Sequence, residues 1–286
     1  MNNYKKSETL EYIQEVDYGL MEVAKKIFQN HNLSYFLIAG SFLGAVRHKG
    51  FIPWDDDVDF GMPRQDYEIF LNHMHEWLPD GFTAENFGVN SDYKYYITRV
   101  YDENAPILEL RGEGEGTKTN VSIDIFPFDG TPNNKVHRWF FMKEIMFLRM
   151  LASFANRSNI DDKRQRNILE QVLITIANVI RIDRFVRAAT FYKIIDRKLK
   201  KYKYDDSEYV GSLMGAYREK EIVKKDWIDP LETYQFEQDF FLGPRNYDAY
   251  LTHMYGDYRQ IPSDDKIIEK QHFSRILELK DKEADR

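Results

Sequence analysis

One short segment of this chain, residues 55–62, restricts its fold more than any other. In this segment Asp57 and Asp59 alternate with apolar residues. Alternation with a period of two predicts a β-strand with one buried face, and side chains two apart point to the same side, roughly 7 Å apart. Asp57 and Asp59 are therefore expected to face one side of a strand, where they can share a divalent cation.

The sequence around this segment predicts an α/β (α+β) fold. Apolar residues recur every three or four positions over residues 8–30, which is typical of an amphipathic helix, and the apolar run 35–39 predicts a buried strand. That strand ends at Gly40-Ser41, where a second helix begins, and Pro63 is well placed to open a third. Further strands are expected near residues 95–101, 107–110 and 121–126.

After residue 132 the pattern changes to long helices, over 136–154 and 167–201. We therefore expect a catalytic core at residues 1–132 and a largely helical C-terminal half at 133–286, which could form one continuous domain. The acidic, glycine-rich segment 111–119 is interpreted as a loop or lid between two strands.

A third acid, Asp124, lies between apolar residues in the same way as Asp59. Three carboxylates on two adjacent strands make an oxygen-rich site suited to Mg²⁺ or Mn²⁺, and such ions commonly bind substrate phosphates. Two carboxylates about 4 Å apart repel each other by about 4 kcal/mol at an effective dielectric near 20, so a positive charge is expected among them. This pattern favours phosphoryl chemistry.

Three other interpretations of the acidic run agree less well with the sequence. An acidic surface turn would not alternate with apolar residues. A calcium loop of the EF-hand type needs glycine where Phe60 stands and glutamate where Asp66 stands. The aspartate-rich motif of prenyl-transferring enzymes lies on a helix of an all-helical fold, and no second copy of that motif is visible.

The residues upstream of the acids are suited to an anionic substrate. A strand that ends at Gly40-Ser41 and opens a helix can present backbone N–H groups and the Ser41 hydroxyl to a phosphate. Arg47, His48 and Arg64 provide basic groups on either side of the acids, although each alone would be an ordinary surface charge.

Composition excludes several classes of function. The chain has 286 residues, 43% of them hydrophobic, which is enough for one large core or two smaller ones. Its formal net charge of -7 gives no reason to expect a nucleic-acid partner, and the absence of cysteine agrees with a reducing compartment. The N-terminal residues do not resemble a signal peptide, and charges interrupt the apolar stretch 168–191, so we expect a cytoplasmic protein.

Taken together, the motifs closely resemble the LicD family. The matching segments are residues 40–48, 51–59, 62–67, 123–130 and 255–258, together with Pro262 and His272. The resemblance is dense over residues 33–130 and thinner over 244–273, whereas residues 132–240 carry no matching motif.

This resemblance implies a nucleotidyltransferase-type mixed sheet flanked by helices. Asp57, Asp59 and Asp124 match the metal-binding acids of the family, which includes the fukutin-related ribitol-phosphate transferases. It also implies transfer of phosphocholine, or of ribitol or glycerol phosphate, from a CDP-activated donor to a glycan such as teichoic acid, capsule or lipopolysaccharide. Asp55 or Asp56 would then accept the proton of the acceptor hydroxyl.

Two competing functions remain open at this point. The same fold could transfer the nucleotide itself to a protein or small molecule, or the chain could be a non-catalytic binding module for glycan assembly.

The helix expected at 136–154 is apolar around most of its circumference, which favours a core position. The alternative is peripheral contact with the inner face of a membrane that carries a lipid-linked acceptor. The oligomeric state and the acceptor sugar are not predicted.

Overall fold

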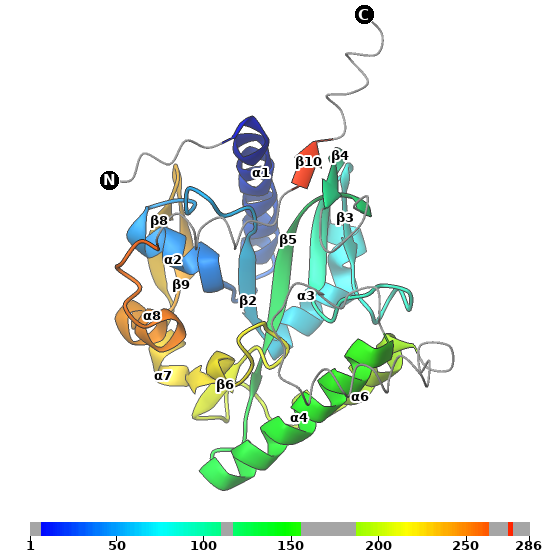
Figure 1. Cartoon of the computed structure of the whole chain (residues 1–286), viewed down its shortest axis with the longest axis vertical. Coiled ribbons are helices and arrows are strands. Elements are labelled where there is room, and N and C mark those ends of the chain that lie inside the picture. Colours follow the sequence, from blue (N-terminus) through cyan, green and yellow to red (C-terminus); the bar gives the residue numbers. More distant parts are fainter. Residues whose placement is uncertain (1–6, 110–116, 156–186, 263–273, 277–286) are drawn as a thin grey trace, which may run out of the picture.

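The computed structural model describes residues 7–109, 117–155, 187–262 and 274–276 (Figure 1). A curled mixed sheet lies at its centre with helices on its sides, which confirms the predicted α/β class. The principal strand order is β1-β2-β5-β4-β10, in which β2 and β5 run parallel and the other neighbours antiparallel. The five strands are β1 (Phe36–Leu37), β2 (Asp59–Pro63), β5 (Thr117–Gly130), β4 (Thr98–Glu109) and β10 (Ser274–Ile276).

The first predicted helix is confirmed as α1 (Glu8–Asn30). The hydroxyl of Ser7 caps it by accepting a hydrogen bond from the backbone N–H of Leu10 at 3.2 Å. Its apolar face packs against β5 and β4, so α1 forms one wall of the main core.

The predicted strand–turn–helix unit is confirmed, with a shorter strand than expected. The β1 strand contains two residues, and α2 (Ala39–Arg47) follows directly. Ala39 has a φ of 47°, a left-handed backbone that is strained for a residue with a side chain. The chain thus turns sharply at the point where the sequence predicted a phosphate-binding turn.

The strand expected over residues 57–62 begins later than predicted. The β2 strand starts at Asp59, and Asp57 lies in the irregular segment that precedes it. On one side the Ile38 N–H donates to the Asp59 carbonyl, and on the other the Asp124 N–H donates to the Val58 carbonyl, so among the described residues the backbone pairing ends before Asp57. The next helix, α3 (Arg64–Trp77), follows Pro63 as predicted.

The next strands are longer than expected. One strand, β4, joins residues 98–101 and 107–109 of the two extended segments expected near 95–101 and 107–110, whereas residues 95–97 precede the strand. It pairs with β3 (Phe82–Glu85), which the sequence analysis missed. The strand β5 begins at Thr117, so the last residues of the expected loop 111–119 belong to a strand. Residues 110–116 lie outside the described residues.

The C-terminal half contains the long predicted helix α4 (Lys135–Ala155), and α6 (Ala188–Leu199) lies beside it. Of the helix expected at 167–201, residues 167–186 lie outside the described part of the chain. The half also contains short elements that were not predicted. These are β6 (Tyr209–Gly211), η3 (Arg218–Glu221), β7 (Val223–Lys224), α7 (Lys225–Ile228), β8 (Glu232–Phe236), β9 (Asp239–Gly243) and α8 (Tyr247–Tyr255).

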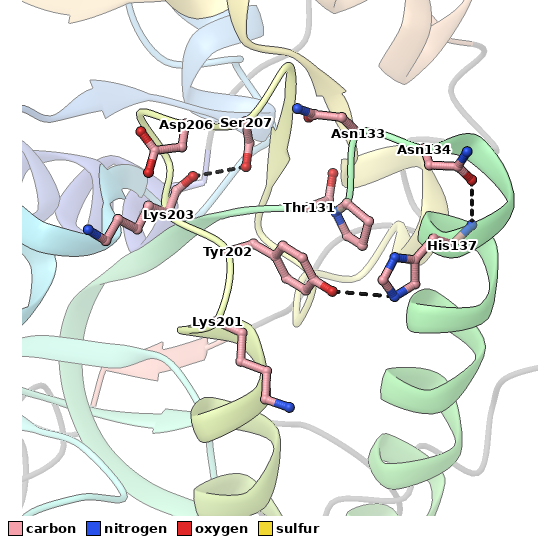
Figure 2. Close-up of a pocket in the computed structure, with 10 residues that line it drawn as sticks. Thr131, Asn133, Asn134, His137, Lys201, Tyr202, Lys203, Asp206 and Ser207 are labelled. Atoms are coloured by element: carbon pink, nitrogen blue, oxygen red, sulfur yellow. Dashed lines mark hydrogen bonds between the residues drawn. The ribbon is translucent and has the colours of Figure 1, made fainter.

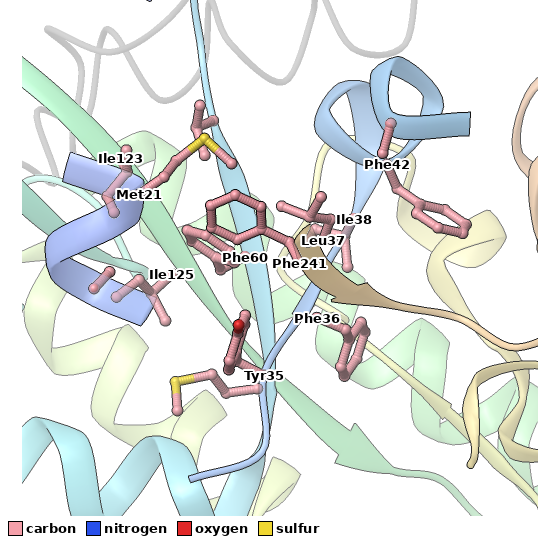
Figure 3. Packing of buried hydrophobic residues seen from close by; sticks show 14 of the residues in the cluster. Met21, Tyr35, Phe36, Leu37, Ile38, Phe42, Phe60, Ile123, Ile125 and Phe241 are labelled. Carbon is pink, nitrogen blue, oxygen red and sulfur yellow. The ribbon is translucent and has the colours of Figure 1, made fainter. Parts of the chain in front are cut away.

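Two apolar cores hold these layers together. In the larger core, Phe60 of β2 lies among Met21 of α1, Tyr35 and Phe241 (Figure 3). The smaller core joins α4 and α6 to residues 87–96, so its buried side chains come from both sides of residue 132. Among the described residues, no helix is long and apolar enough to cross a bilayer.

The two sides of α4 differ in character. Phe141, Met142 and Ile145 are buried in the smaller core, as the sequence favoured. The other side leaves large apolar side chains in solvent, with exposed fractions of 53–64% for Val136, Trp139, Phe140 and Phe147.

A buried ion-pair network around Arg64 joins three of these elements. The Arg64 guanidinium donates two hydrogen bonds to Asp129 of β5, both 2.7 Å long, and a third to Asp196 of α6 at 3.0 Å. Asp129 is completely buried, and Arg64 is also bonded to Tyr96 and to Glu68. The network therefore links α3, β5 and α6 where the two cores meet.

Replacing Arg64 tests the strength of this network. Arg64→Leu should lower the free energy of unfolding by about 3–5 kcal/mol, because it leaves the buried Asp129 carboxylate without a partner. Urea denaturation measures the change. The matched control is Arg259→Leu, which removes an exposed ion pair with Asp248 and should cost no more than about 1 kcal/mol. Equal losses in the two variants would contradict a structural role for Arg64.

Candidate active site

Two of the predicted acids, Asp59 and Asp124, lie side by side in the sheet. They are register partners in the parallel pair β2–β5, and the Asp124 N–H donates to the Val58 carbonyl at 2.8 Å. Neighbouring strands are about 4.8 Å apart, so side chains of paired residues leave the same face close together. The parallel pairing thus brings together two acids that are 65 residues apart in the sequence.

A cation that the sequence analysis missed extends this row. Arg99 on β4 is the register partner of Asp124, and its Nε lies 2.9 Å from Asp124 Oδ1. Its guanidinium also lies over the ring of Tyr95, 4.1 Å from the ring centroid. Arg99 supplies part of the positive charge that the repulsion between the acids requires.

Gly40 and Ser41, in the first turn of α2, lie directly against the acids. The Asp59 N–H donates to Ser41 Oγ at 2.9 Å, and the Ser41 hydroxyl keeps its own hydrogen for another acceptor. A Cβ atom on Gly40 would overlap the Asp55 carboxylate, so only glycine leaves that carboxylate its position. The predicted phosphate turn and the acidic segment therefore form one site.

The segment that carries Asp55, Asp56 and Asp57 is anchored from α1. Gln14 Nε2 donates to the backbone carbonyl of Ile52 at 3.2 Å and to that of Asp55 at 2.7 Å. This segment has no regular secondary structure, so these hydrogen bonds help to hold it beside β2.

Two of the predicted basic residues border the site. The Arg47 guanidinium donates to the carbonyls of Tyr258 and Gln260, and the negative charge of Asp55 acts on it. Burial and the charge of Arg47 lower the pKa of His48 to about 4, so the imidazole is neutral at neutral pH. Arg47 thus carries positive charge here, whereas His48 offers a neutral donor and acceptor.

Arg64, in contrast, lies at the other end of β2. Its neighbour Pro63 pairs with Phe128, whereas Asp59 pairs with Asp124. Four residues along a strand span roughly 13 Å. The structure therefore places Arg64 in the buried network with Asp129 and does not bring it to the acids.

The electrostatics of the site are dominated by repulsion. Burial raises the pKa of the Asp59 carboxyl well above its usual value, and the charges of Asp57, Asp124 and Asp55 raise it further. In the described part of the chain, the acid side chains do not already form a group of three or more placed as ligands of one ion. Their oxygen-only chemistry and excess negative charge nevertheless fit a hard divalent cation such as Mg²⁺ or Mn²⁺.

Another acid that sequence reasoning missed, Glu221 of η3, contributes to the same field. It is nearly buried and accepts a hydrogen bond from the Tyr217 N–H at 3.1 Å, and its charge acts on Asp59. Burial raises the pKa of Glu221 to about 7. No motif in the sequence marks this residue, because it approaches the site only through the folding of the C-terminal half.

A pocket lies away from the acids. This pocket is polar, has a volume of about 370 Å³ and lies at the start of α4. The Tyr202 hydroxyl and His137 Nε2 are 3.4 Å apart in it, and the Ser207 hydroxyl donates to the Lys203 carbonyl (Figure 2). Thr131 in its wall is seven residues along the chain from Asp124, which corresponds to roughly 20 Å of extended strand. It contains none of the predicted site residues.

The site thus combines a mixed sheet, a strand–turn–helix unit and two acids on a central parallel pair of strands. Residues 32–149 match the family described as LicD/FKTN/FKRP, nucleotidyltransferase domain. Residues 32–149 therefore form a LicD-family domain, as the motifs indicated.

The chain is similar to two proteins that are named as transferases and to one that is uncharacterized. It is 24% identical over 263 residues to the lipopolysaccharide cholinephosphotransferase LicD of Haemophilus influenzae, which covers 91% of this chain and 95% of that protein. It is 32% identical over 111 residues to the ribitol-5-phosphate transferase FKTN of Mus musculus, covering 38% of this chain and 20% of that protein. An uncharacterized protein of Rickettsia prowazekii is 37% identical over 82 residues, or 29% of each chain.

The raised pKa of Glu221 makes protein stability depend on pH. The unfolded side chain ionises near pH 4.5 and the folded one near pH 7. Between these values the folded state retains a proton that the unfolded chain has lost, so wild-type stability falls as the pH rises through this window. Glu221→Gln cannot ionise and should be more stable than the wild type at pH 8, by up to about 3 kcal/mol, and equal to it near pH 4.

Urea denaturation at the two pH values checks this expectation. The control is Glu208→Gln, an exposed position, for which the difference from wild type should stay within about 0.5 kcal/mol at both pH values. A Glu221→Gln variant whose difference from wild type does not change with pH would show that Glu221 ionises normally in the folded protein.

Proposed function

We propose that this protein is a metal-dependent phosphotransferase that moves a phospho-alcohol from a CDP-activated donor to a hydroxyl group of a cell-surface glycan. The observation that carries the proposal is the pairing of Asp59 with Asp124, next to a turn whose Ser41 hydroxyl is hydrogen-bonded to Asp59. The names of the two related transferases support a phosphate-linked cargo, which is phosphocholine in one and ribitol phosphate in the other.

In this proposal Asp57, Asp59 and Asp124 hold the cation, and Asp124 is oriented by Arg99. When bound, Mg²⁺ or Mn²⁺ neutralises the charge that develops on the transferred phosphate and on the departing nucleotide. The first N–H groups of α2 have no partner within the helix and, together with the Ser41 hydroxyl, are available to phosphate oxygens.

The acceptor oxygen then forms a bond to phosphorus as the bond to the CMP oxygen breaks. Asp55 or Asp56 takes the proton of the acceptor hydroxyl. Arg47 and His48 orient the phosphate oxygens at the edge of the site. Arg64 takes no part, because its guanidinium is occupied by Asp129 and Asp196.

Purified protein incubated with a glycan acceptor, with CDP-choline, CDP-ribitol or CDP-glycerol as donor, and with Mg²⁺ or Mn²⁺ provides the test. We expect CMP to be released, and turnover should fall at least about 100-fold in Asp59→Asn and in Asp124→Asn, because each removes a charge needed in the transition state. Glu76→Gln, a change at an exposed acid near the C-terminal end of α3, is the matched control and should keep its activity.

The products separate this proposal from its alternatives. Release of pyrophosphate from a nucleoside triphosphate would instead indicate nucleotidyl transfer. Full activity in excess chelator, or in Asp59→Asn with unchanged circular dichroism, would contradict a catalytic cation site. Lack of turnover with every donor and with glycan acceptor present would favour a binding module.

We further propose that the exposed side of α4 rests on a membrane that carries the acceptor, at its cytoplasmic face. The support is the apolar stripe of Val136, Phe140 and Phe147. Lys143, on the same side of the helix, is half-exposed and forms an ion pair with Glu219 at 2.7 Å. Two other basic residues of α4, Arg138 and Arg149, donate to backbone carbonyls of the protein itself.

Vesicle sedimentation tests this contact. The wild type should co-sediment with vesicles that contain phosphatidylglycerol, and a Phe140→Ser/Phe147→Ser variant should bind at least about tenfold more weakly, because two exposed aromatic groups are lost. Ile69→Ser, which alters an exposed apolar residue of α3, is the control. Equal sedimentation of wild type and double variant would contradict the contact.

A further inference from the structure

One buried acid is not used by the function proposed above. Asp17 lies in the middle of the apolar face of α1, between Ile13 and Leu20, and its side chain is completely buried. Neither of its carboxylate oxygens has a hydrogen-bond partner among the described residues. A buried carboxylate without a partner is rare, because such groups cost several kcal/mol when ionised.

The position of Asp17 relative to the acids follows from its neighbour Gln14. These residues are three apart and lie on the same face of α1, one turn from each other. Gln14 donates to the carbonyls of Ile52 and Asp55, so this face of the helix borders the acidic segment from the protein interior. Asp17 therefore lies behind the acids, on the side that solvent does not reach.

The charges around Asp17 are unfavourable in the absence of a cation. Burial raises its pKa well above the usual value, and the charges of Asp57, Asp56 and Asp124 raise it further. An apolar side chain would fill this interior position at lower cost. The carboxylate becomes favourable only if positive charge is present nearby, because attraction is stronger in a poorly solvated interior than in water.

We propose that Asp17 is a further acid of the cation site, one that raises its affinity for Mg²⁺ or Mn²⁺ by placing negative charge on the interior side of the acidic segment. This inference rests on the cation site of the proposed function and concerns binding of the ion, so it can be tested without turnover. Asp17 acts on the ion together with Asp57 and Asp124, and it does not contact the donor or the acceptor.

This role predicts that removing the charge of Asp17 raises the stability of the metal-free protein and lowers its affinity for Mn²⁺. Asp17→Asn keeps the size of the side chain and removes its charge. The metal-free variant should therefore melt at a higher temperature than the metal-free wild type, because an uncompensated buried carboxylate has been removed. The same variant should bind Mn²⁺ at least about tenfold more weakly, so the increase in melting temperature on adding Mn²⁺ should be smaller. An acid with a merely structural role would not change the affinity for the ion.

The experiment uses the full chain, freed of metal by chelation, and titrates MnCl₂ alone by calorimetry and by thermal shift. Glu15→Gln, on the exposed side of α1, removes one charge from the same helix and should bind Mn²⁺ like the wild type. Asp59→Asn is the positive control for loss of the ion. Asp17→Ala provides a second neutral variant and should show the same loss of affinity as Asp17→Asn.

Unchanged Mn²⁺ affinity in both Asp17 variants would overturn the inference, as would a wild type that binds no Mn²⁺. These results are separable from a failure of the proposed function. If the wild type binds Mn²⁺ through Asp17 but transfers nothing, the inference stands and the phosphotransferase proposal fails. If the wild type transfers and the Asp17 variants bind Mn²⁺ normally, only the inference fails.

Discussion

The parallel pairing of β2 with β5 is the constraint on which the rest of the structure depends. It places Asp59 beside Asp124 and makes the two carboxylates repel each other in a partly buried site. Such repulsion is tolerated only where positive charge or solvent compensates it. The contact between Arg99 and Asp124 supplies one compensation within the chain, and the remaining negative charge is what a divalent cation would neutralise.

Several other features are arranged around this pair. Ser41 is hydrogen-bonded to the backbone of Asp59, and Gly40 leaves room for the Asp55 carboxylate. Gln14 anchors the acidic segment to α1, and Arg47 ties the site to the carbonyl of Tyr258 near the end of the described chain. Elements distant in the sequence therefore converge at the start of β2, while the Arg64 network stabilises the opposite end of that strand.

The site was predictable in part because its main acids alternate with apolar residues. That signal is local, and it located Asp59 and Asp124 on strands even though β2 starts two residues after Asp57. Arg64 was placed near the acids because it is close to them in sequence, but an extended strand carries it away from them. Asp17 left a trace in the sequence, an acid on the apolar face of a helix, which could have been read as a buried functional group.

The sequence by itself determined the α/β class, the helix α1 and the acid-bearing strands, because periodicity and turn residues act over short distances. Only the tertiary structure decided that Asp59 pairs with Asp124, that Arg99 completes their row, and that Asp17 and Glu221 approach them. Strand order and register depend on contacts between residues far apart in the chain, and no local pattern encodes them. The motifs therefore located the candidate site, whereas the set of charged side chains around it required the fold.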